Sequence, residues 1–477
     1  MTAKDFEVVM GLEVHVELKT ETKIFCGCAT AFGAEPNTQV CPVCLGLPGT
    51  LPVLNGKVVD YAVKAGIATN CTITPYGKQD RKNYFYPDLP KAYQISQYDL
   101  PLCHDGYIDI EVQGQSRRIG ITRIHIEEDA GKLVHDGEGT LIDYNRGGVP
   151  LIEIVSEPDL RSAEEVRAYL MKLRAILLYA GISDCRMNEG SFRCDVNLSV
   201  RPRGEAEYGT RTEMKNLNSF SFIQKAIEHE TQRQIALVLS GGQVIQETRR
   251  WDQAAGKSVA MRTKEDAHDY RYFPDPDLMP IVVTDEKLRQ LGAELPPLPD
   301  ERKAHYVHHY GLGTYDAEQL VSSRAVADYF EAAAAVTDSP KLLANLITTE
   351  VFRLLGDGDE EAVPPFPAEH LGILVNRVAD ETINIGIAKR VLGALWAGEG
   401  HPDAVIEAQD LKQISDEAVL EPIVAAVVAE GAKAVAEYRA GKEKALQSLV
   451  GQVMARTKGK ANPRKVNELL EKAVGAQ

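Results

Sequence analysis

Two stretches in which apolar and polar residues alternate, Gly120–Glu128 and Pro150–Val155, constrain the fold of this 477-residue chain more than any other feature. Side chains of a β-strand point alternately to opposite faces, so a period of two predicts strands rather than helices. A connection rich in Gly and Asp joins the two stretches, as expected between neighbouring strands. We therefore expect two neighbouring strands here, with the rest of the chain supporting them.

Each of these expected strands carries a carboxylate on the face that should be buried. Glu128 follows Ile124 and Ile126 on one face, and Glu153 lies between two apolar neighbours on its own face. A buried carboxylate is costly unless it is paired or binds a metal. A salt bridge or a strand end would explain one such residue. Two of them in neighbouring strands favour a divalent cation site, because carboxylate oxygens hold such ions.

The first strand-like segment, Val8–Thr20, places Glu13, His15 and Glu17 on one face. Taken alone, this pattern is that of a strand whose polar face meets solvent. Glu13 and His15 are nevertheless two residues apart, so both could reach one ion or phosphate. They are further candidates for the expected cation site.

Four of the eight cysteines fall within nineteen residues as C-x-C-x12-C-x2-C: Cys26, Cys28, Cys41 and Cys44. Where thiols stay reduced, this spacing indicates a tetrahedral zinc site rather than disulfides. Four cysteine ligands leave no open coordination position, so we expect the zinc to be structural.

The segment Asp80–Asp88 places basic, amide and aromatic side chains in a loop rich in turns. Arg81 and Lys82 could neutralise a phosphate, and the aromatic rings could stack on a base. An ordinary packed aromatic loop is the alternative. We find no G-x-G-x-x-G or G-x4-GK[ST] motif after a strand, which disfavours a Rossmann or P-loop nucleotide site.

The charge of the chain is unevenly distributed. The formal net charge is −16, but residues 431–477 hold ten Lys and Arg against four Asp and Glu, a net charge of +6 that leaves −22 for the rest. A basic end on an acidic body could contact a polyanion, or it could be an amphipathic tail with a solvated face. With no apparent signal peptide and no apolar run long enough to span a bilayer, we expect a cytoplasmic protein.

The element pattern predicts an α+β chain of three domains, because its length exceeds one ordinary core. Residues 1–293 are mixed and largely antiparallel, with amphipathic helices at 162–181 and 222–240. After the linker at 294–299 the pattern is helical, and we divide it into domains 294–405 and 406–477. Ser415 is the expected N-cap of one tail helix and Asn462 that of the last.

The loop before that last helix gathers four basic residues at a turn and a helix start. This geometry suits contacts to a phosphate backbone, which carry no sequence specificity. The four residues are Lys458, Lys460, Arg464 and Lys465.

Six long motifs give the whole chain a family resemblance. In chain order they are GLEVHVEL, DRKNYFYPDLPKAYQISQ, HIEEDAGK, PLIEIVSEPD, KNLNSF and DYRYFPDPDL. The chain resembles the B-subunit family of the bacterial glutamyl-tRNA(Gln)/aspartyl-tRNA(Asn) amidotransferases. The resemblance implies a β cradle domain related to the glutamine synthetase fold, a helical domain and a helical tail that binds tRNA. The four-cysteine motif occurs in only part of this family, so its zinc depends on the spacing alone.

The resemblance also implies a reaction and its participants. ATP, with Mg²⁺, phosphorylates the side-chain carboxylate of a mischarged Glu or Asp on tRNA, and ammonia then displaces the phosphate. The implied partners are an amidase (glutaminase), which supplies the ammonia, and a small bridging protein, with no membrane. The roles expected from the residues fit this reaction: Mg²⁺ ligands at Glu128 and Glu153, supported by Glu13 and His15, and phosphate contacts from Arg81, Lys82 and Lys215.

A function of another class remains open at this stage. The chain could be a tRNA-binding adaptor whose carboxylates are structural and whose cysteine motif and tail do the binding. An adaptor would tolerate neutral replacements of its buried carboxylates, whereas a phosphoryl-transfer enzyme would not.

Overall fold

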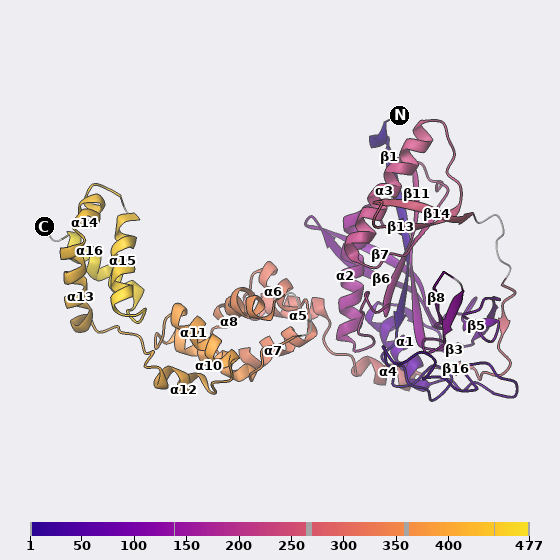
Figure 1. Ribbon diagram of the computed structural model, residues 1–477, viewed down its shortest axis with the longest axis horizontal. Coiled ribbons are helices and arrows are strands. Elements are labelled where there is room, and N and C mark those ends of the chain that lie inside the picture. The colour runs from indigo at the N-terminus through magenta and orange to yellow at the C-terminus, as the bar shows by residue number, and fades with distance from the viewer. Residues whose placement is uncertain (1, 138, 264–269, 357–361, 443, 476–477) are drawn as a thin grey trace. The chain divides into compact units, whose positions relative to one another are not determined.

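The computed structural model describes residues 2–137, 139–263, 270–356, 362–442 and 444–475, and its chain divides into two compact units, Met1–Leu298 and Pro299–Gln477 (Figure 1). Every described strand lies in the first unit, and the second is helical, which confirms the α+β class. The first unit extends past the expected end at residue 293 because Leu295 and Leu298 pack against its core. Asp269, which begins the DYRYFPDPDL motif, lies outside the described residues.

A nine-stranded sheet forms the body of the first unit. Neighbouring strands are antiparallel, except for one parallel pair, β12 and β13. In spatial order the strands are β14 (Lys257–Thr263), β13 (Glu247–Asp252), β12 (Thr212–Lys215), β11 (Phe192–Pro202), β1 (Phe6–Glu17), β10 (Pro150–Ser156), β7 (Gln115–Glu128), β6 (Cys103–Val112) and β2 (Thr72–Ile73).

Three helices pack against one face of this sheet: α1 (Gly56–Ala68), α2 (Ala163–Tyr179) and α3 (Phe220–Leu239). Apolar residues of the strands alternate toward these helices, and in β1 the side chains of Leu12 and Val14 are fully buried. The opposite face of β1 therefore presents its polar residues. Burial of the apolar face fixes which side of the sheet can carry charged groups.

Smaller elements complete the first unit. Two short sheets, β15-β4-β5 and β16-β3, and one hairpin, β8-β9, lie outside the large sheet. The elements are η1 (Ala3–Asp5), β3 (Tyr76–Gly77), β4 (Asp80–Asn83), β5 (Tyr93–Ser96), β8 (Lys132–His135), β9 (Thr140–Asp143), β15 (Phe273–Pro274), β16 (Ile281–Val282) and α4 (Asp285–Ala293).

The second unit contains two separate clusters of buried apolar residues, one from Tyr306 to Leu411 and one from Leu420 to Val474. The division into domains 294–405 and 406–477 stays a proposal. The helices are α5 (Pro299–His308), α6 (Thr314–Leu320), α7 (Arg324–Ala334), α8 (Pro340–Leu346), η2 (Ile347–Val351), α9 (Phe352–Leu355), α10 (Ala368–Ala379), α11 (Ile385–Trp396), α12 (Pro402–Ala408), α13 (Glu417–Glu430), α14 (Ala432–Arg439), α15 (Lys444–Arg456) and α16 (Pro463–Gly475).

The expected helix caps are partly correct. The Asn462 side chain accepts a hydrogen bond from Arg464 N at the start of α16, as expected. The expected cap at Ser415 is wrong, because Asp416 accepts from Ala418 N and begins α13 instead. Within the described part of the chain, none of the helices has the combination of length and apolar character that crossing a bilayer requires.

A buried carboxylate joins α3 to the strands at the edge of the large sheet. Glu230 is fully buried and accepts hydrogen bonds from Thr212 of β12, Arg233 of α3 and Ser258 of β14. Its Oε2 also lies 3.3 Å from Nε of Arg249 in β13. Burial raises the pKa of Glu230, but the hydrogen bonds to the charged form outweigh burial and lower it.

We expect Glu230→Gln to lower the free energy of unfolding by about 1–3 kcal/mol, because it removes a buried charge that accepts several hydrogen bonds and leaves Glu247 to balance both Arg233 and Arg249. Urea unfolding followed by Trp251 fluorescence, in a Trp396→Phe background, measures this loss. Glu228→Gln changes an exposed carboxylate two residues away on the same helix and is the matched control. Equal midpoints for the two variants would contradict the assigned role of Glu230.

Candidate functional site

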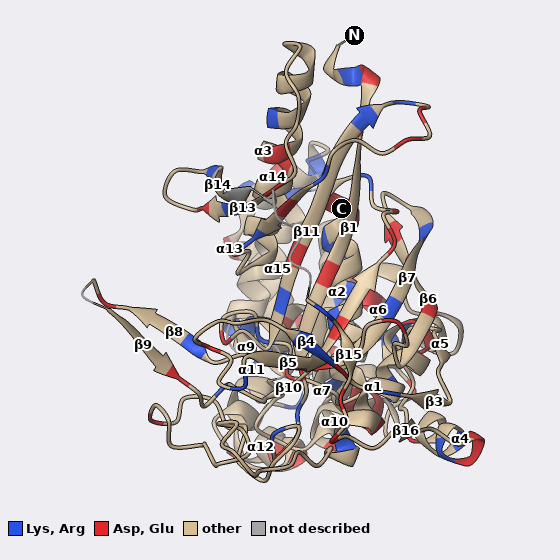
Figure 2. Cartoon of the chain, turned by 90° about the vertical axis from the view of Figure 1, so that its right-hand side faces the viewer, with Lys and Arg blue, Asp and Glu red and all other residues tan. Residues whose placement is uncertain are grey.

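The polar face of the large sheet brings charged residues of several strands together. Glu153 of β10 lies opposite His15 of β1 in the strand register, and Asp195 of β11 lies opposite Glu13. On the far side of β10, His125 of β7 lies opposite Glu153. Figure 2 shows acidic and basic positions along β1 and β11. Residues paired in this way point to the same face, so they form one continuous charged surface.

The first cluster on this surface contains two histidines and two carboxylates. Nε2 of His15 lies 3.6 Å from both Glu127 Oε1 and Glu153 Oε2. Nε2 of His125 lies 3.3 Å from Glu153 Oε2 and 3.7 Å from Glu127 Oε2. His15, Glu127 and Glu153 each offer a ligand atom within 4.8 Å of the others, which is the spacing of ligands around one ion. This first cluster fits a divalent cation.

The charges of the first cluster shift the pKa values of its members. Burial lowers the pKa of His15, but its contacts with Glu153 and Glu127 outweigh burial and raise that pKa to about 8. The same carboxylates raise the pKa of His125 to about 9. Burial raises the pKa of Glu153, yet the two imidazoles hold it well below its usual range. Two imidazolium groups thus supply the positive charge that a metal ion would supply.

A second cluster lies beside the first on the same face and contains Glu13, Asp195 and Glu213, whose ligand atoms are also within 4.8 Å of one another. Nζ of Lys215 lies 2.5 Å from Asp195 Oδ2 and 3.1 Å from Glu213 Oε1. Asn197 Nδ2 donates to Glu13 Oε1 over 2.9 Å. Burial, followed by the nearby charge of Glu153, raises the pKa of Glu13. The two clusters are therefore electrostatically coupled.

The structure does not bring Glu128 together with Glu153, although the sequence predicts that they share one cation site. Glu128 is buried as expected, but it lies on the apolar face, where Lys91 Nζ is 2.5 Å from its Oε1 and Ile95 N donates to the same oxygen. Among the described residues, no group of three potential ligands includes Glu128. Ion pairing, the alternative considered from the sequence, accounts for its burial.

Glu128 and Glu153 lie on opposite faces of the sheet, and the sequence of β10 does not show which of its faces packs against the helices. Ile152 and Ile154 face the helices and are fully buried, so Glu153 faces the charged surface together with Leu151. Leu151 is also buried, which makes the two faces of β10 look equally apolar in the sequence. Glu127, rather than Glu128, is the β7 carboxylate beside Glu153.

Sequence reasoning also missed Asp195 and Glu213 as candidate ligands. Asp195 alternates with buried residues in β11, but only the pairing of β11 with β1 brings it beside Glu13. The sequence does contain one signal for them: Glu13, Asp195 and Glu213 each occupy a polar position in a segment where apolar and polar residues alternate.

Two residues expected to contact phosphate, Arg81 and Lys82, differ in how firmly other residues of the chain hold them. Arg81 forms ion pairs with Asp275 over 2.7 Å and with Asp277 over 2.8 Å. Nζ of Lys82 lies 4.9 Å from the centre of the Tyr270 ring, and among the described residues no carboxylate pairs with it. Lys82 is therefore more available than Arg81 to an incoming anion.

An aromatic segment extends this region to the first cluster. The rings of Tyr272 and Tyr98 stack with their centroids 4.4 Å apart. Burial, followed by the charges of Glu127 and Glu153, raises the pKa of Tyr272. Aromatic surface thus adjoins the candidate cation site.

The four cysteines of the spaced motif come together as the sequence predicts. The Sγ atoms of Cys26, Cys28, Cys41 and Cys44 lie within 4.8 Å of one another, which fits one tetrahedral zinc ion. Lys23 is buried, with Nζ 3.8 Å from Cys44 Sγ. A hydrogen bond from Cys26 and the Lys23 charge help to lower the pKa of Cys44 to about 4. This cluster lies outside the polar face and suits a structural ion.

The four basic tail residues gather at the connection from α15 to α16. Lys458 is exposed and adopts a left-handed backbone conformation at φ 52°. The other three form ion pairs: Lys460 with Asp410 at 2.6 Å, Arg464 with Glu468 at 3.2 Å and Lys465 with Glu417 at 2.9 Å. These pairs hold the basic groups in place and reduce their net charge.

Comparison with known proteins adds an independent finding. Residues 8–289 match the family described as the GatB/GatE catalytic domain, and residues 328–474 match the GatB domain. The B-subunit of the aspartyl/glutamyl-tRNA(Asn/Gln) amidotransferase of Caldicellulosiruptor saccharolyticus is 57% identical over 472 residues, covering 98% of each chain. Proteins of the same name from Caldanaerobacter subterraneus subsp. tengcongensis and Geobacter sulfurreducens are 57% and 54% identical, over 467 and 474 residues, respectively. The first covers 98% of each chain, and the second covers 98% of this chain and 99% of its own.

Proposed function

The chain belongs to the GatB/GatE family of amidotransferase subunits, and on that premise we propose that it amidates Glu or Asp mischarged on tRNA in an ATP-dependent reaction. In the first step the side-chain carboxylate attacks the γ-phosphorus of ATP and ADP leaves. In the second, ammonia attacks the acyl phosphate and inorganic phosphate leaves. The observation that supports this proposal is the pair of adjacent clusters on the polar face.

Two neighbouring cation sites suit phosphoryl transfer because this reaction depends on positioning and charge neutralisation. Glu127, Glu153 and the neutral form of His15 would hold one Mg²⁺, so binding there would release the proton of His15. Glu13, Asp195 and Glu213 would hold a second divalent cation. Bound there, the ions would neutralise phosphate oxygens. The chain's own residues keep the ligand atoms on a rigid sheet, so little reorganisation is needed on binding.

Two lysines of the polar region have distinct proposed tasks. Lys82 is placed to neutralise a phosphate, since no described carboxylate holds it. Lys215 balances the charges of Asp195 and Glu213, and a cation held by these carboxylates would leave its ammonium available to substrate. Arg81 we assign a supporting role, since Asp275 and Asp277 already bind its guanidinium.

Ammonia must come from a partner in this proposal. The sequence has no Gly/Ser-rich amidase signature with a nucleophilic serine, and no cysteine in a recognisable nucleophile motif. We propose a separate amidase (glutaminase) chain as the source, held in place by a small bridging protein. The basic tail would contact the tRNA backbone, and a zinc ion in the four-cysteine cluster would stabilise its loop.

We expect Glu153→Gln to lower ADP release and amide formation by at least about 100-fold, because a neutral amide is a much weaker ligand for Mg²⁺ than a carboxylate. The assay uses the chain co-purified with its partner proteins, supplied with Mg-ATP, Glu-tRNA(Gln) and an ammonium salt in place of glutamine. Glu7→Gln, which changes a β1 carboxylate that pairs with Arg201 outside both clusters, is the control.

Affinity for tRNA should stay unchanged in Glu153→Gln, which separates lost chemistry from lost binding. If Glu153→Gln amidates at the wild-type rate, the reaction does not take place at the first cluster. That result would also favour the alternative of a tRNA-binding adaptor.

Cys28→Ser should abolish stoichiometric zinc binding and lower the melting temperature, because a structural zinc contributes its binding energy to folding. Zinc released from the denatured protein, measured with a chromogenic chelator, gives the ion content per chain. Cys71→Ser changes a half-buried cysteine outside the cluster and should leave both quantities unchanged. A wild-type chain without zinc that melts at the same temperature would rule out the structural role.

Replacing Lys458, Lys460, Arg464 and Lys465 by Gln should weaken tRNA binding and flatten its dependence on salt. Each phosphate interaction that is removed lowers the slope of log affinity against log salt by about 0.7–0.9. Filter binding or anisotropy at several salt concentrations measures this slope. Exchanging Lys for Arg and Arg for Lys at the same four positions keeps the charge and should keep the slope. An unchanged slope in the Gln variant would exclude this contact.

A further inference from the structure

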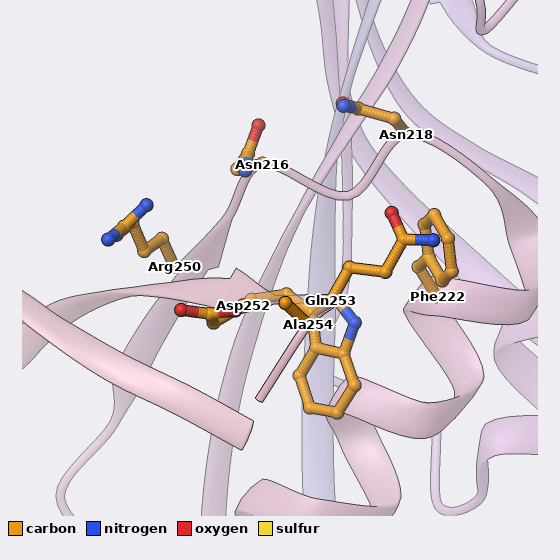
Figure 3. A pocket seen from close by; sticks show the side chains of 8 residues that line it. Asn216, Asn218, Phe222, Arg250, Asp252, Gln253 and Ala254 are labelled. Carbon is orange, nitrogen blue, oxygen red and sulfur yellow. The ribbon is translucent and has the colours of Figure 1, made fainter. Parts of the chain in front are cut away.

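A pocket of 510 Å³ lies at one end of the large sheet, outside both acidic clusters (Figure 3). Its volume falls within the range of roughly 300–1,000 Å³ that small-molecule sites occupy. It is lined by Asn216, Asn218, Phe222, Arg250, Trp251, Asp252, Gln253 and Ala254.

The pocket lies at a βαβ unit, an arrangement that often binds ligands. Strands β12 and β13 are parallel, and α3 connects them in the chain, so the three elements form a βαβ unit. The lining residues come from the last three positions of β13, from the segments that directly follow β12 and β13, and from the first turn of α3, where Phe222 lies. Ligands of βαβ units bind outside the carboxyl ends of the parallel strands, near the helix N-terminus.

An independent observation points to a missing ligand. The Trp251 side chain lines the pocket and is only 6% exposed, yet its indole Nε1–H meets no hydrogen-bond acceptor among the described residues. A buried donor without an acceptor costs about 1–3 kcal/mol. A ligand that supplies an acceptor would relieve this cost.

The other lining groups define the chemistry of that ligand. Three primary amides, on Asn216, Asn218 and Gln253, can each donate and accept hydrogen bonds, as the edge of a nucleobase requires. Phe222 offers an aromatic face for stacking. The exposed Arg250 guanidinium has no ion-pair partner among residues that the structure describes and suits a phosphate.

The arrangement of these groups matches one nucleotide. In Figure 3, Arg250 and Asn216 lie on one side of the pocket, and Phe222 and Asn218 lie on the other. A phosphate at the first side and a base at the second would span it. Asp252 also lines the pocket, and its Oδ1 accepts a hydrogen bond from Ala255 N over 3.0 Å.

The pocket adjoins the second acidic cluster through two strand residues. Arg250 lies opposite Lys215 in the register of β12 and β13, and Lys215 Nζ is 3.1 Å from Glu213 Oε1. In an aminoacyl-tRNA, only a few bonds separate the side-chain carboxylate from the ribose of the 3′-terminal nucleotide. The nucleotide that carries the reacting group must therefore be held close to the cation clusters.

We propose that this pocket binds the 3′-terminal nucleotide of the substrate tRNA, with its phosphate at Arg250 and its base among the amides and Phe222. This inference rests on the proposed function for its substrate. In this proposal the βαβ unit at the sheet edge positions the substrate, and a different set of residues would hold the cations.

The test is a double-mutant cycle between the pocket and the end of the tRNA. The double variant Asn218→Ala, Gln253→Ala removes two exposed amides, and Gln115→Ala, Gln243→Ala removes two exposed amides elsewhere as the matched control. Trp251→Phe removes the buried N–H and keeps an aromatic ring. Each full-length chain, co-purified with its partner proteins, is titrated with intact tRNA and with tRNA lacking its terminal nucleotide, without ATP.

The pocket variants should bind intact tRNA about two- to hundredfold more weakly, the range expected when one or two hydrogen bonds are lost. They should bind the truncated tRNA as well as the wild type does, because the contact is already absent. The control variant should match the wild type with both RNAs.

Equal weakening with intact and truncated tRNA, or none with either, would overturn the proposal. A separate titration with a non-hydrolysable ATP analogue gives the affinity for free nucleotide, and weaker binding of this analogue with unchanged tRNA affinity would also overturn the proposal. These binding measurements need no catalysis. If the proposed function is wrong, Glu153→Gln will keep full activity. If the proposed pocket is wrong, only these binding measurements will show it, so the two failures can be distinguished.

Discussion

The pairing of β1 with β10 and β11 is the constraint on which the rest of the structure depends. This antiparallel register turns Leu12 and Val14 toward the helices and aligns His15 with Glu153 and Glu13 with Asp195 on the other face. A slip of one residue would exchange the two faces, burying charges and exposing the core. Apolar burial therefore fixes the position of every candidate ligand, although it involves none of them directly.

Charge balance is the second consequence of this register. Carboxylates at the centre of a sheet repel one another, and the neighbouring strands supply the compensation as His125, Lys215 and Arg193. Compensation is incomplete at Glu17, where burial and the nearby Asp129 raise the pKa to about 8. A surface held in this state gains from binding divalent cations, because they replace several separate counter-charges with one ion at close range.

The chain separates tasks among local structures that the sheet brings together. The central strands carry two candidate cation clusters, the βαβ unit at the edge carries the polar pocket, and the cysteine loop carries a site suited to zinc. Glu230 of α3 ties this helix to β12 and β14 through hydrogen bonds from Thr212 and Ser258. Rigid elements rather than loops thus position most of the proposed chemistry, which favours precise geometry.

Local features of the sequence determined a large part of this protein. The α+β class, the approach of the four cysteines and the cap at Asn462 follow from periodicity, spacing and turn chemistry, which act over a few residues. The same reasoning identified Glu13, His15 and Glu153 as members of a common charged region, and the structure brings them together.

Only the tertiary structure decided which residues meet across strands. Glu128 pairs with Lys91, Glu127 takes the place beside Glu153, and Asp195 and Glu213 join Glu13. The βαβ pocket likewise depends on β12 and β13 being parallel neighbours. The alternation of apolar and polar residues gives each strand two faces. It does not show which face meets the core when both contain buried residues, and it does not show which strands are neighbours. Packing of the helices on one face settles both questions, because a single register buries the apolar side of every strand at once.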